Sequence, residues 1–253
     1  MDATILVQTR HDLAETRAFL AIAESTDFVA GVVGWVDLAS ARVADDIAAL
    51  RREPGGRYLV GIRHMLQDEA DPRWIERREV ARGLAVLGEQ GLVYDLLVRP
   101  RDLPAGLAVA RRFPALRFVL DHIGKPPIAN GARDPGLRRE WASRMAPFAE
   151  LPNVWCKLSG MVTEADWAAW RAEDLAPYVA AVLGWFGEDR LLFGSDWPVC
   201  LLAADYGRVK RTAEALLAPL APARRDKIFG GNATAMYRLP SEAAADPTGA
   251  GAR

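Results

Sequence analysis

The chain has 253 residues, a formal net charge of −1 at neutral pH, and 51% hydrophobic and 26% charged residues. This composition is that of an ordinary globular protein, and the length suits one (β/α)8 barrel of about 250 residues. No basic stripe is present to neutralise phosphates, which argues against nucleic acid as the main ligand. No apolar run reaches the roughly 18 residues of a membrane helix, and no secretory signal follows Met1. We therefore expect a cytoplasmic protein without nucleic-acid or membrane partners.

Apolar runs rich in Val, Ile and Leu alternate along the chain with stretches of helical periodicity. The expected strands cover residues 4–8, 29–36, 58–63, 92–98, 116–121, 153–158 and 190–194. The expected helices cover residues 12–25, 41–52, 72–90, 104–112, 138–151, 175–186 and 206–217. Strands that are apolar nearly throughout indicate a parallel sheet buried on both faces by helices. Such strand–helix repeats form a doubly wound sheet or a barrel, and the missing glycine fingerprint of a dinucleotide site disfavours the doubly wound sheet.

Polar residues gather at the carboxyl ends of the expected strands, which favours the barrel. They are Gln8, Trp35, Asp37, Arg63, His64, His122, Lys157, Ser159, Ser195 and Asp196. In a parallel barrel these ends share one face, where active sites lie. Seven strands leave two unpaired edges, which a closed barrel abolishes. We therefore expect one barrel domain over residues 1–239 that lacks a strand, followed by a disordered tail over residues 240–253.

Asp196 is the first candidate for chemistry, because it stands in the segment GSDWP directly after the last expected strand. Gly194 allows the backbone to turn tightly there, and Pro198 ends strand pairing. A carboxylate at a strand end can act as a general base on water or ligate a metal. The alternative is that Asp196 only caps or stabilises the turn.

Two of the three histidines, His64 and His122, lie at expected strand ends. Neutral imidazole can bind a metal, polarise a carbonyl or shuttle a proton, although a lone histidine is more often structural. The third, His11, lies in a polar turn, and we expect it to be exposed. Trp35 and Trp197 stand where they could stack on a ring substrate.

Arg63 and Lys157 are the charged residues expected within or at the end of strands. Arg63 could grip a carboxylate or hold developing negative charge, or it could satisfy loop carbonyls. Lys157 would be costly to bury unpaired, so we expect an ion pair or a position at the barrel mouth. The acidic run at residues 68–71 is more typical of a solvated loop than of a metal site.

The sequence contains no His-x-His, no Gly-x-Ser-x-Gly and no phosphate-binding loop. Hydrolysis through a serine nucleophile is therefore disfavoured. Direct attack by water, with one group as base and another polarising a carbonyl, remains open.

Several segments together resemble the amidohydrolase-2 family, and within it the sugar lactonases of the L-fuconolactonase and L-rhamnonolactonase kind. They are VQTRHDLAETRAFLAIA, GVVGWVDL, GIRHMLQDE, YDLLVRP, FVLDHIGKPPI, NVWCKLSG and GSDWPVCLLAADY, spanning about residues 4–239. The resemblance implies a (β/α)8 barrel of the metal-dependent hydrolase kind that opens a sugar-acid lactone with water. It implies Asp196 as base or metal ligand and His122 as its catalytic partner or a second ligand. It also implies substrate contacts by Arg63, His64, Trp35, Tyr94 and Trp197.

The chain departs from the family at its start. The family opens with a strand ending in His-x-His, which supplies two ligands to a divalent metal, but here only three residues precede TILVQ. We hypothesise that Met1 is a misassigned start and that the reading frame begins upstream. Of the family ligands only His122 and Asp196 remain, whereas zinc at a catalytic site takes three protein ligands. We therefore expect zinc in intact relatives and weak or no zinc binding in this chain.

The resemblance leaves other functions open, because a fold does not fix a reaction. One alternative is decarboxylation, or another hydrolysis, of a small carboxylic acid on the same scaffold. Another is a non-catalytic sugar-acid binder or an inactive truncated paralogue. The expected partner is a small-molecule substrate, with a homo-oligomer as a further possibility.

Overall fold

The computed structural model describes residues 2–131 and 133–239, so the expected tail lies outside the described residues. Seven strands form one sheet in chain order, and every neighbouring pair is parallel. The strands are β1 (Thr4–Val7), β2 (Val29–Gly34), β3 (Leu59–Met65), β4 (Val93–Leu97), β5 (Arg117–Leu120), β6 (Val154–Leu158) and β7 (Leu191–Phe193). Each lies within one residue or two of an expected strand, so the strand prediction is confirmed.

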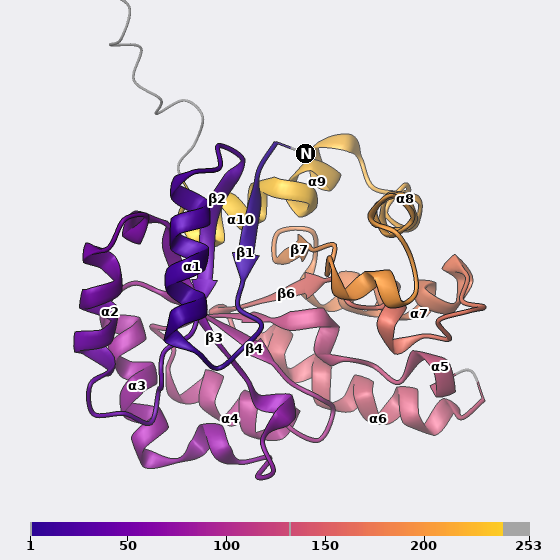
Figure 1. Cartoon of the computed structure of the whole chain (residues 1–253). Coiled ribbons are helices and arrows are strands. Elements are labelled where there is room, and N and C mark those ends of the chain that lie inside the picture. The colour runs from indigo at the N-terminus through magenta and orange to yellow at the C-terminus, as the bar shows by residue number, and fades with distance from the viewer. Residues whose placement is uncertain (1, 132, 240–253) are drawn as a thin grey trace, which may run out of the picture.

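Helices connect the strands and line the outside of the curled sheet (Figure 1). They are α1 (Leu13–Glu24), α2 (Val43–Arg52), α3 (Arg78–Glu89), α4 (Leu103–Arg112), α5 (Ile128–Gly131), α6 (Pro135–Met145), α7 (Ala172–Phe186), α8 (Tyr206–Leu216), α9 (Pro222–Asp226) and α10 (Asn232–Tyr237). The sequence did not predict α5, α9 or α10, which have four to six residues each.

Two expected helices are three or more residues shorter than predicted. The stretch 72–90 breaks at Arg77, whose extended ψ of 143° separates a turn of 3-10 helix from α3. The stretch 138–151 starts earlier, at Pro135, because the Asp134 carboxylate accepts a hydrogen bond from Gly136 N at 2.8 Å and caps α6. Pro147, which has no N–H for an α-helical bond, then lies in the 3-10 turn that follows α6.

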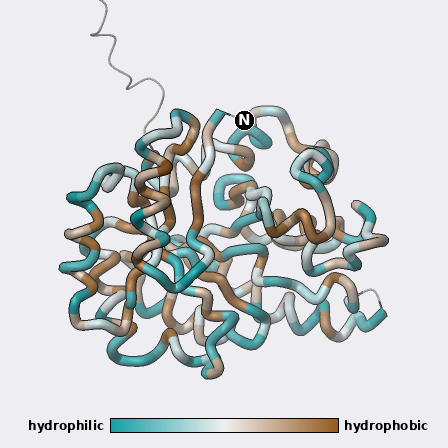
Figure 2. Tube along the Cα trace, in the orientation of Figure 1, coloured by the Kyte–Doolittle hydropathy of each residue, from teal (hydrophilic) through white to brown (hydrophobic). Residues whose placement is uncertain are grey.

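Hydrophobic side chains form two layers, one on each face of the sheet. The larger lies between the sheet and the helices, where hydrophobic and hydrophilic residues alternate along each helix (Figure 2). The smaller lies inside the curl and contains Val33, Val93, Val119, Leu192, Met236 and Tyr237. The last two belong to α10, which lies beside the starts of the first strands (Figure 1). The C-terminal helix therefore fills the amino-terminal end of the curl.

Among the described residues, the fold is that of a TIM-type barrel with one strand fewer, as the sequence predicted. β1 and β7 are the edges of the sheet, and among the described residues each pairs with one strand only. The loops that follow the strands all open at the carboxyl end of the sheet. Within the described part of the chain, no helix is both long and apolar enough to cross a membrane.

Candidate functional site

A network of buried charges occupies the inside of the curl. Lys157 on β6 reaches Asp95 on β4 at 2.5 Å and Asp121 at the end of β5 at 2.7 Å, and both carboxylates are fully buried. Tyr237 donates a hydrogen bond to Asp95 at 2.8 Å, which ties α10 to this network. Burial alone would lower the pKa of Lys157, but the charges of Asp121 and Asp95 outweigh it and raise that pKa. Lys157 is therefore a charged, paired residue, as the sequence predicted.

Arg63 joins the same network instead of facing an open mouth. Its Nη1 donates to Asp121 Oδ2 at 2.9 Å, and its other nitrogens donate to the backbone and side-chain oxygens of Gln8. Burial raises the pKa of Asp121, but the charges of Lys157 and Arg63 hold it well below its ordinary value. Most of the five guanidinium N–H groups are thus engaged, so Arg63 has few donors free to bind a substrate.

His122 and Asp196 come together at the carboxyl end of the sheet. His122 Nε2 lies 3.6 Å from Asp196 Oδ1, and the two side chains are 12% and 13% exposed. This separation is too long for a direct hydrogen bond, and both groups remain accessible. Burial lowers the pKa of His122 from its ordinary value, so the ring is neutral near pH 7.

The backbone is strained where it presents these two residues. Five non-glycine residues among those described have positive φ: His122, Ile123, Lys125, Asp196 and Arg238. Four of them lie in the two turns that carry His122 and Asp196. Such left-handed residues cost about 1–3 kcal/mol each and cluster at functional sites. The local conformation therefore marks the two turns as a candidate active site.

The end of β6 sets the position of the His122 ring. Ser159 Oγ lies 2.9 Å from His122 Nδ1 and is the polar neighbour of that nitrogen. A side chain at Gly160 would meet the imidazole at 2.6 Å, and one at Gly194 would meet the Ser159 Cβ at 3.0 Å. Ser159 is thus packed between the ring and the turn of Asp196. If its hydroxyl donates to Nδ1, the His122 proton lies on Nε2, facing Asp196.

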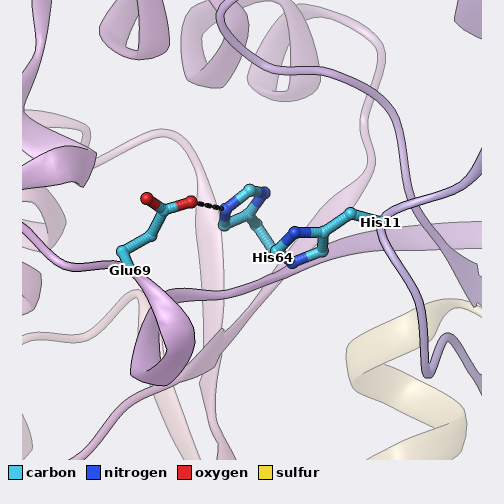
Figure 3. Close-up of side chains that lie close together, drawn as sticks. All are labelled: His11, His64 and Glu69. Atoms are coloured by element: carbon cyan, nitrogen blue, oxygen red, sulfur yellow. Dashed lines mark hydrogen bonds and ion pairs between the residues drawn. The ribbon is translucent and has the colours of Figure 1, made fainter.

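His64 lies outside this pair, in a stack of rings at the rim. His64 Nδ1 accepts from Trp35 Nε1 at 3.2 Å. Its Nε2 donates to Glu69 Oε1 at 2.8 Å, the contact drawn as a dashed line in Figure 3. The ring is sandwiched between His11, at 3.8 Å between centroids, and Trp74, at 4.0 Å. Burial lowers the pKa of His64 to about 4. Because both nitrogens are engaged, the ring holds Trp35 and the Glu69 loop in place.

His11 is exposed, as expected, but its ring makes a hydrogen bond. Its Nε2 accepts a hydrogen bond from the backbone N–H of Met65 at 2.9 Å, and burial of the ring lowers its pKa. Glu69, which the sequence placed in a solvated loop, instead lies beside the buried His64. The histidine and acidic side chains of the rim therefore form a connected group.

Two groups of side chains can be tested as holders of a divalent ion. His122 and Asp196 supply two ligand atoms, one fewer than a catalytic zinc site takes. His11, His64 and Glu69 bring three ligand atoms within 4.8 Å of one another (Figure 3). However, the indole N–H and the Met65 N–H already occupy the one lone pair that each neutral imidazole offers. An ion would have to displace both donors, so neither group fits zinc as it is arranged.

The remaining expected substrate residues fall in different places. Trp197 is 62% exposed and follows Asp196 directly, so its ring is free at the rim. Trp35 is partly buried and tied to His64. Tyr94 has no exposed surface and packs edge-on against Phe118 in the layer between sheet and helices. The structure does not bring Tyr94 to the site, because its neighbours on β4, not Tyr94 itself, face the inside of the curl.

Comparisons with known proteins agree with this architecture. The sequence pattern of the amidohydrolase family matches residues 6–239. The L-fucono-1,5-lactonase of Burkholderia ambifaria is 46% identical over 243 residues, covering 93% of this chain and 80% of that protein. Two crystal structures of an amidohydrolase from Burkholderia multivorans, one with bound HEPES and one with bound zinc, are 42% identical. Their TM-scores are 0.90 and 0.88, and each match covers 95% of this chain and 84% of the other. The chain therefore belongs to the amidohydrolase family.

Proposed function

We propose that this protein is a hydrolase that opens a sugar lactone by attack of water. Two observations support the substrate class: the extent of the match to an L-fucono-1,5-lactonase, and a pair of accessible polar groups at the mouth of the barrel. The observation that carries the proposal is the His122–Asp196 pair, held 3.6 Å apart by strained turns. A neutral imidazole can donate a hydrogen bond to a lactone carbonyl, and a carboxylate can take a proton from a water molecule.

In the proposed reaction Asp196 removes a proton from water as the water oxygen bonds to the lactone carbonyl carbon. His122, protonated on Nε2, donates a hydrogen bond to the carbonyl oxygen as it becomes an oxyanion. A donor in that position is worth roughly 10²–10³ in rate. The oxyanion then collapses, the bond from the carbonyl carbon to the ring oxygen breaks, and Asp196 returns its proton to the departing alkoxide. The product is the open hydroxy acid.

Arg63 has a different part in this proposal from the one expected from sequence. Its guanidinium is held by Gln8 and Asp121, so it fixes the floor of the site and leaves the oxyanion to His122. No step is assigned to a metal ion, because the side chains that the structure describes do not supply a free set of three ligands.

The substrate class is tested with a panel of sugar 1,4- and 1,5-lactones, read by acid release, beside aromatic carboxylic acids, read by release of carbon dioxide. We expect turnover of a sugar 1,5-lactone and none of the aromatic acids. Decarboxylation without lactone hydrolysis would overturn the proposal. Binding of lactones without turnover, seen as shifts in melting temperature, would instead indicate a non-catalytic binder.

A further inference from the structure

A cavity of about 420 Å³ opens at the same end of the sheet as His122 and Asp196. It is lined by the loops that follow three neighbouring strands, β4, β5 and β6, through residues Arg99, Pro100, Lys125, Pro127, Ala129, Asn130 and Glu164. The volume lies within the range of small-molecule sites. None of the charged residues in its wall has a part in the reaction proposed above.

The strained turn after β5 connects this cavity to the reacting groups. His122, Ile123 and Lys125 all have left-handed backbone conformations, and Lys125 N donates to His122 O at 2.9 Å. The same turn thus presents His122 toward Asp196 and Lys125 to the cavity wall. The positive charge of Lys125 is among the causes that lower the pKa of His122, which agrees with their proximity. The proposed reaction accounts for the placement of His122 but not for that of Lys125.

Glu164 reaches the cavity from the loop after β6. That loop contains Gly160, where an added side chain would meet the His122 ring. Lys125 Nζ lies 3.6 Å from Glu164 Oε1, with the side chains 23% and 27% exposed. This is longer than the 2.7–3.2 Å of an N–H···O hydrogen bond, so both groups retain capacity for a ligand. A hydroxyl group can donate to the carboxylate and accept from the ammonium, so neighbouring hydroxyls of a sugar suit the pair.

We propose that this cavity binds the hydroxyl-bearing part of the substrate, with Lys125 donating to sugar hydroxyls and Glu164 accepting from them. The inference rests on the proposed function and extends it to the residues that select polyhydroxylated lactones. A carboxylate or phosphate suits the cavity less well, because each cation in the wall already has a carboxylate nearby. Glu164 lies 3.6 Å from Lys125, and Asp68 lies 4.0 Å from Arg99. The side chains that select the substrate are thereby distinct from those that break the lactone bond.

The test compares two lactones of the same ring size, δ-valerolactone, which has no hydroxyls, and a hexono-1,5-lactone. Lys125→Met and Glu164→Gln should each lower kcat/KM for the hexonolactone about tenfold or more, mainly through KM. Turnover of δ-valerolactone should change less than twofold. Lys210→Met and Glu214→Gln, which alter another lysine–glutamate pair, on the exposed face of α8, are matched controls and should alter neither substrate.

Equal losses on both lactones would overturn the inference, because they would mean that the two residues only position His122. No loss on either lactone, or faster turnover of the hexonolactone by Glu164→Gln, would overturn it too. If the unaltered protein hydrolyses neither lactone, the proposed function fails, and the cavity is then tested by calorimetric titration with the matching hexonolactam. Binding that Lys125→Met abolishes and Lys210→Met retains would still support the cavity as a polyol site, and the absence of binding would refute it.

Discussion

Acidification should destabilise this protein through His64, a buried ring whose two nitrogens are both engaged. Protonation of Nδ1 would break its bond to the Trp35 indole. The pKa of His64 is lowered from 6.5 to about 4 because burial outweighs the opposing charges of Glu69 and Asp37, while His11 acts in the same direction as burial. Between these two values the unfolded chain binds a proton that the folded chain does not. The free energy of unfolding therefore keeps the full contribution of His64 above pH 6.5 and loses it as the pH drops toward 4. Below pH 4 this residue causes no further change.

The gap between the two pKa values corresponds to about 3 kcal/mol, since each pH unit is worth about 1.4 kcal/mol. The assay is the free energy of unfolding in urea, followed by circular dichroism from pH 4.5 to 7.5. His64→Gln should remove most of this pH dependence, because an amide can accept from Trp35 and donate to Glu69 without titrating. The exposed His11 provides the control, and His11→Gln should remove less of it. Equal pH slopes for the unaltered protein and His64→Gln would refute the reasoning.

Three further predictions concern other parts of the site. Ser159→Ala should move the His122 proton from Nε2 toward Nδ1, which ¹⁵N NMR spectra would show. It should also lower kcat about tenfold with KM little changed. An unchanged tautomer would contradict the assigned role of the hydroxyl. Lys157→Met should cost about 3–5 kcal/mol of unfolding free energy, because the buried Asp95 carboxylate loses its ion pair. A loss below about 1 kcal/mol would count against a charged pair with Asp95. Zinc should bind weakly or not at all in calorimetric titration, and tight binding of one equivalent would contradict this. If zinc does bind, its loss in His64→Gln would place the ion at His64.

The sequence was sufficient to predict the strands and the face on which the candidate site lies. Seven apolar runs became seven parallel strands, because a strand buried on both faces is apolar throughout. The polar residues that follow these runs had to gather at one end of a parallel sheet, so the sequence alone places His122 and Asp196 on the same face.

Because these strands are apolar throughout, the sequence does not show which residues face the inside of the curl. On β4, Tyr94 faces the helices and Asp95 faces Lys157, and the sequence carries no alternation that separates the two. Arg63 and His64 likewise follow each other on β3 but belong to different groups. Strand ends could therefore be identified from sequence, whereas the direction of each side chain could not.

Contacts between residues that are far apart in the chain could not be predicted from the sequence either. Tyr237 bonds to a carboxylate 142 residues away, and it lies in a helix of six residues that has too little length for a periodic pattern. Glu69 looked like part of a solvated acidic run, and only the fold places it against a buried imidazole. Ser159 was visible at a strand end, but its role depends on how two glycines let it pack between His122 and the Asp196 turn.

The most direct test of the account is the hydrolysis of L-fucono-1,5-lactone by Asp196→Asn. The substitution keeps the shape of the side chain and removes the base, so we expect kcat to fall by roughly 10²–10⁴ while the melting temperature stays close to that of the unaltered protein. Asp205→Asn, which alters the cap of α8, is the control and should retain turnover. Near-normal hydrolysis by Asp196→Asn would contradict the central claim that this carboxylate activates the attacking water.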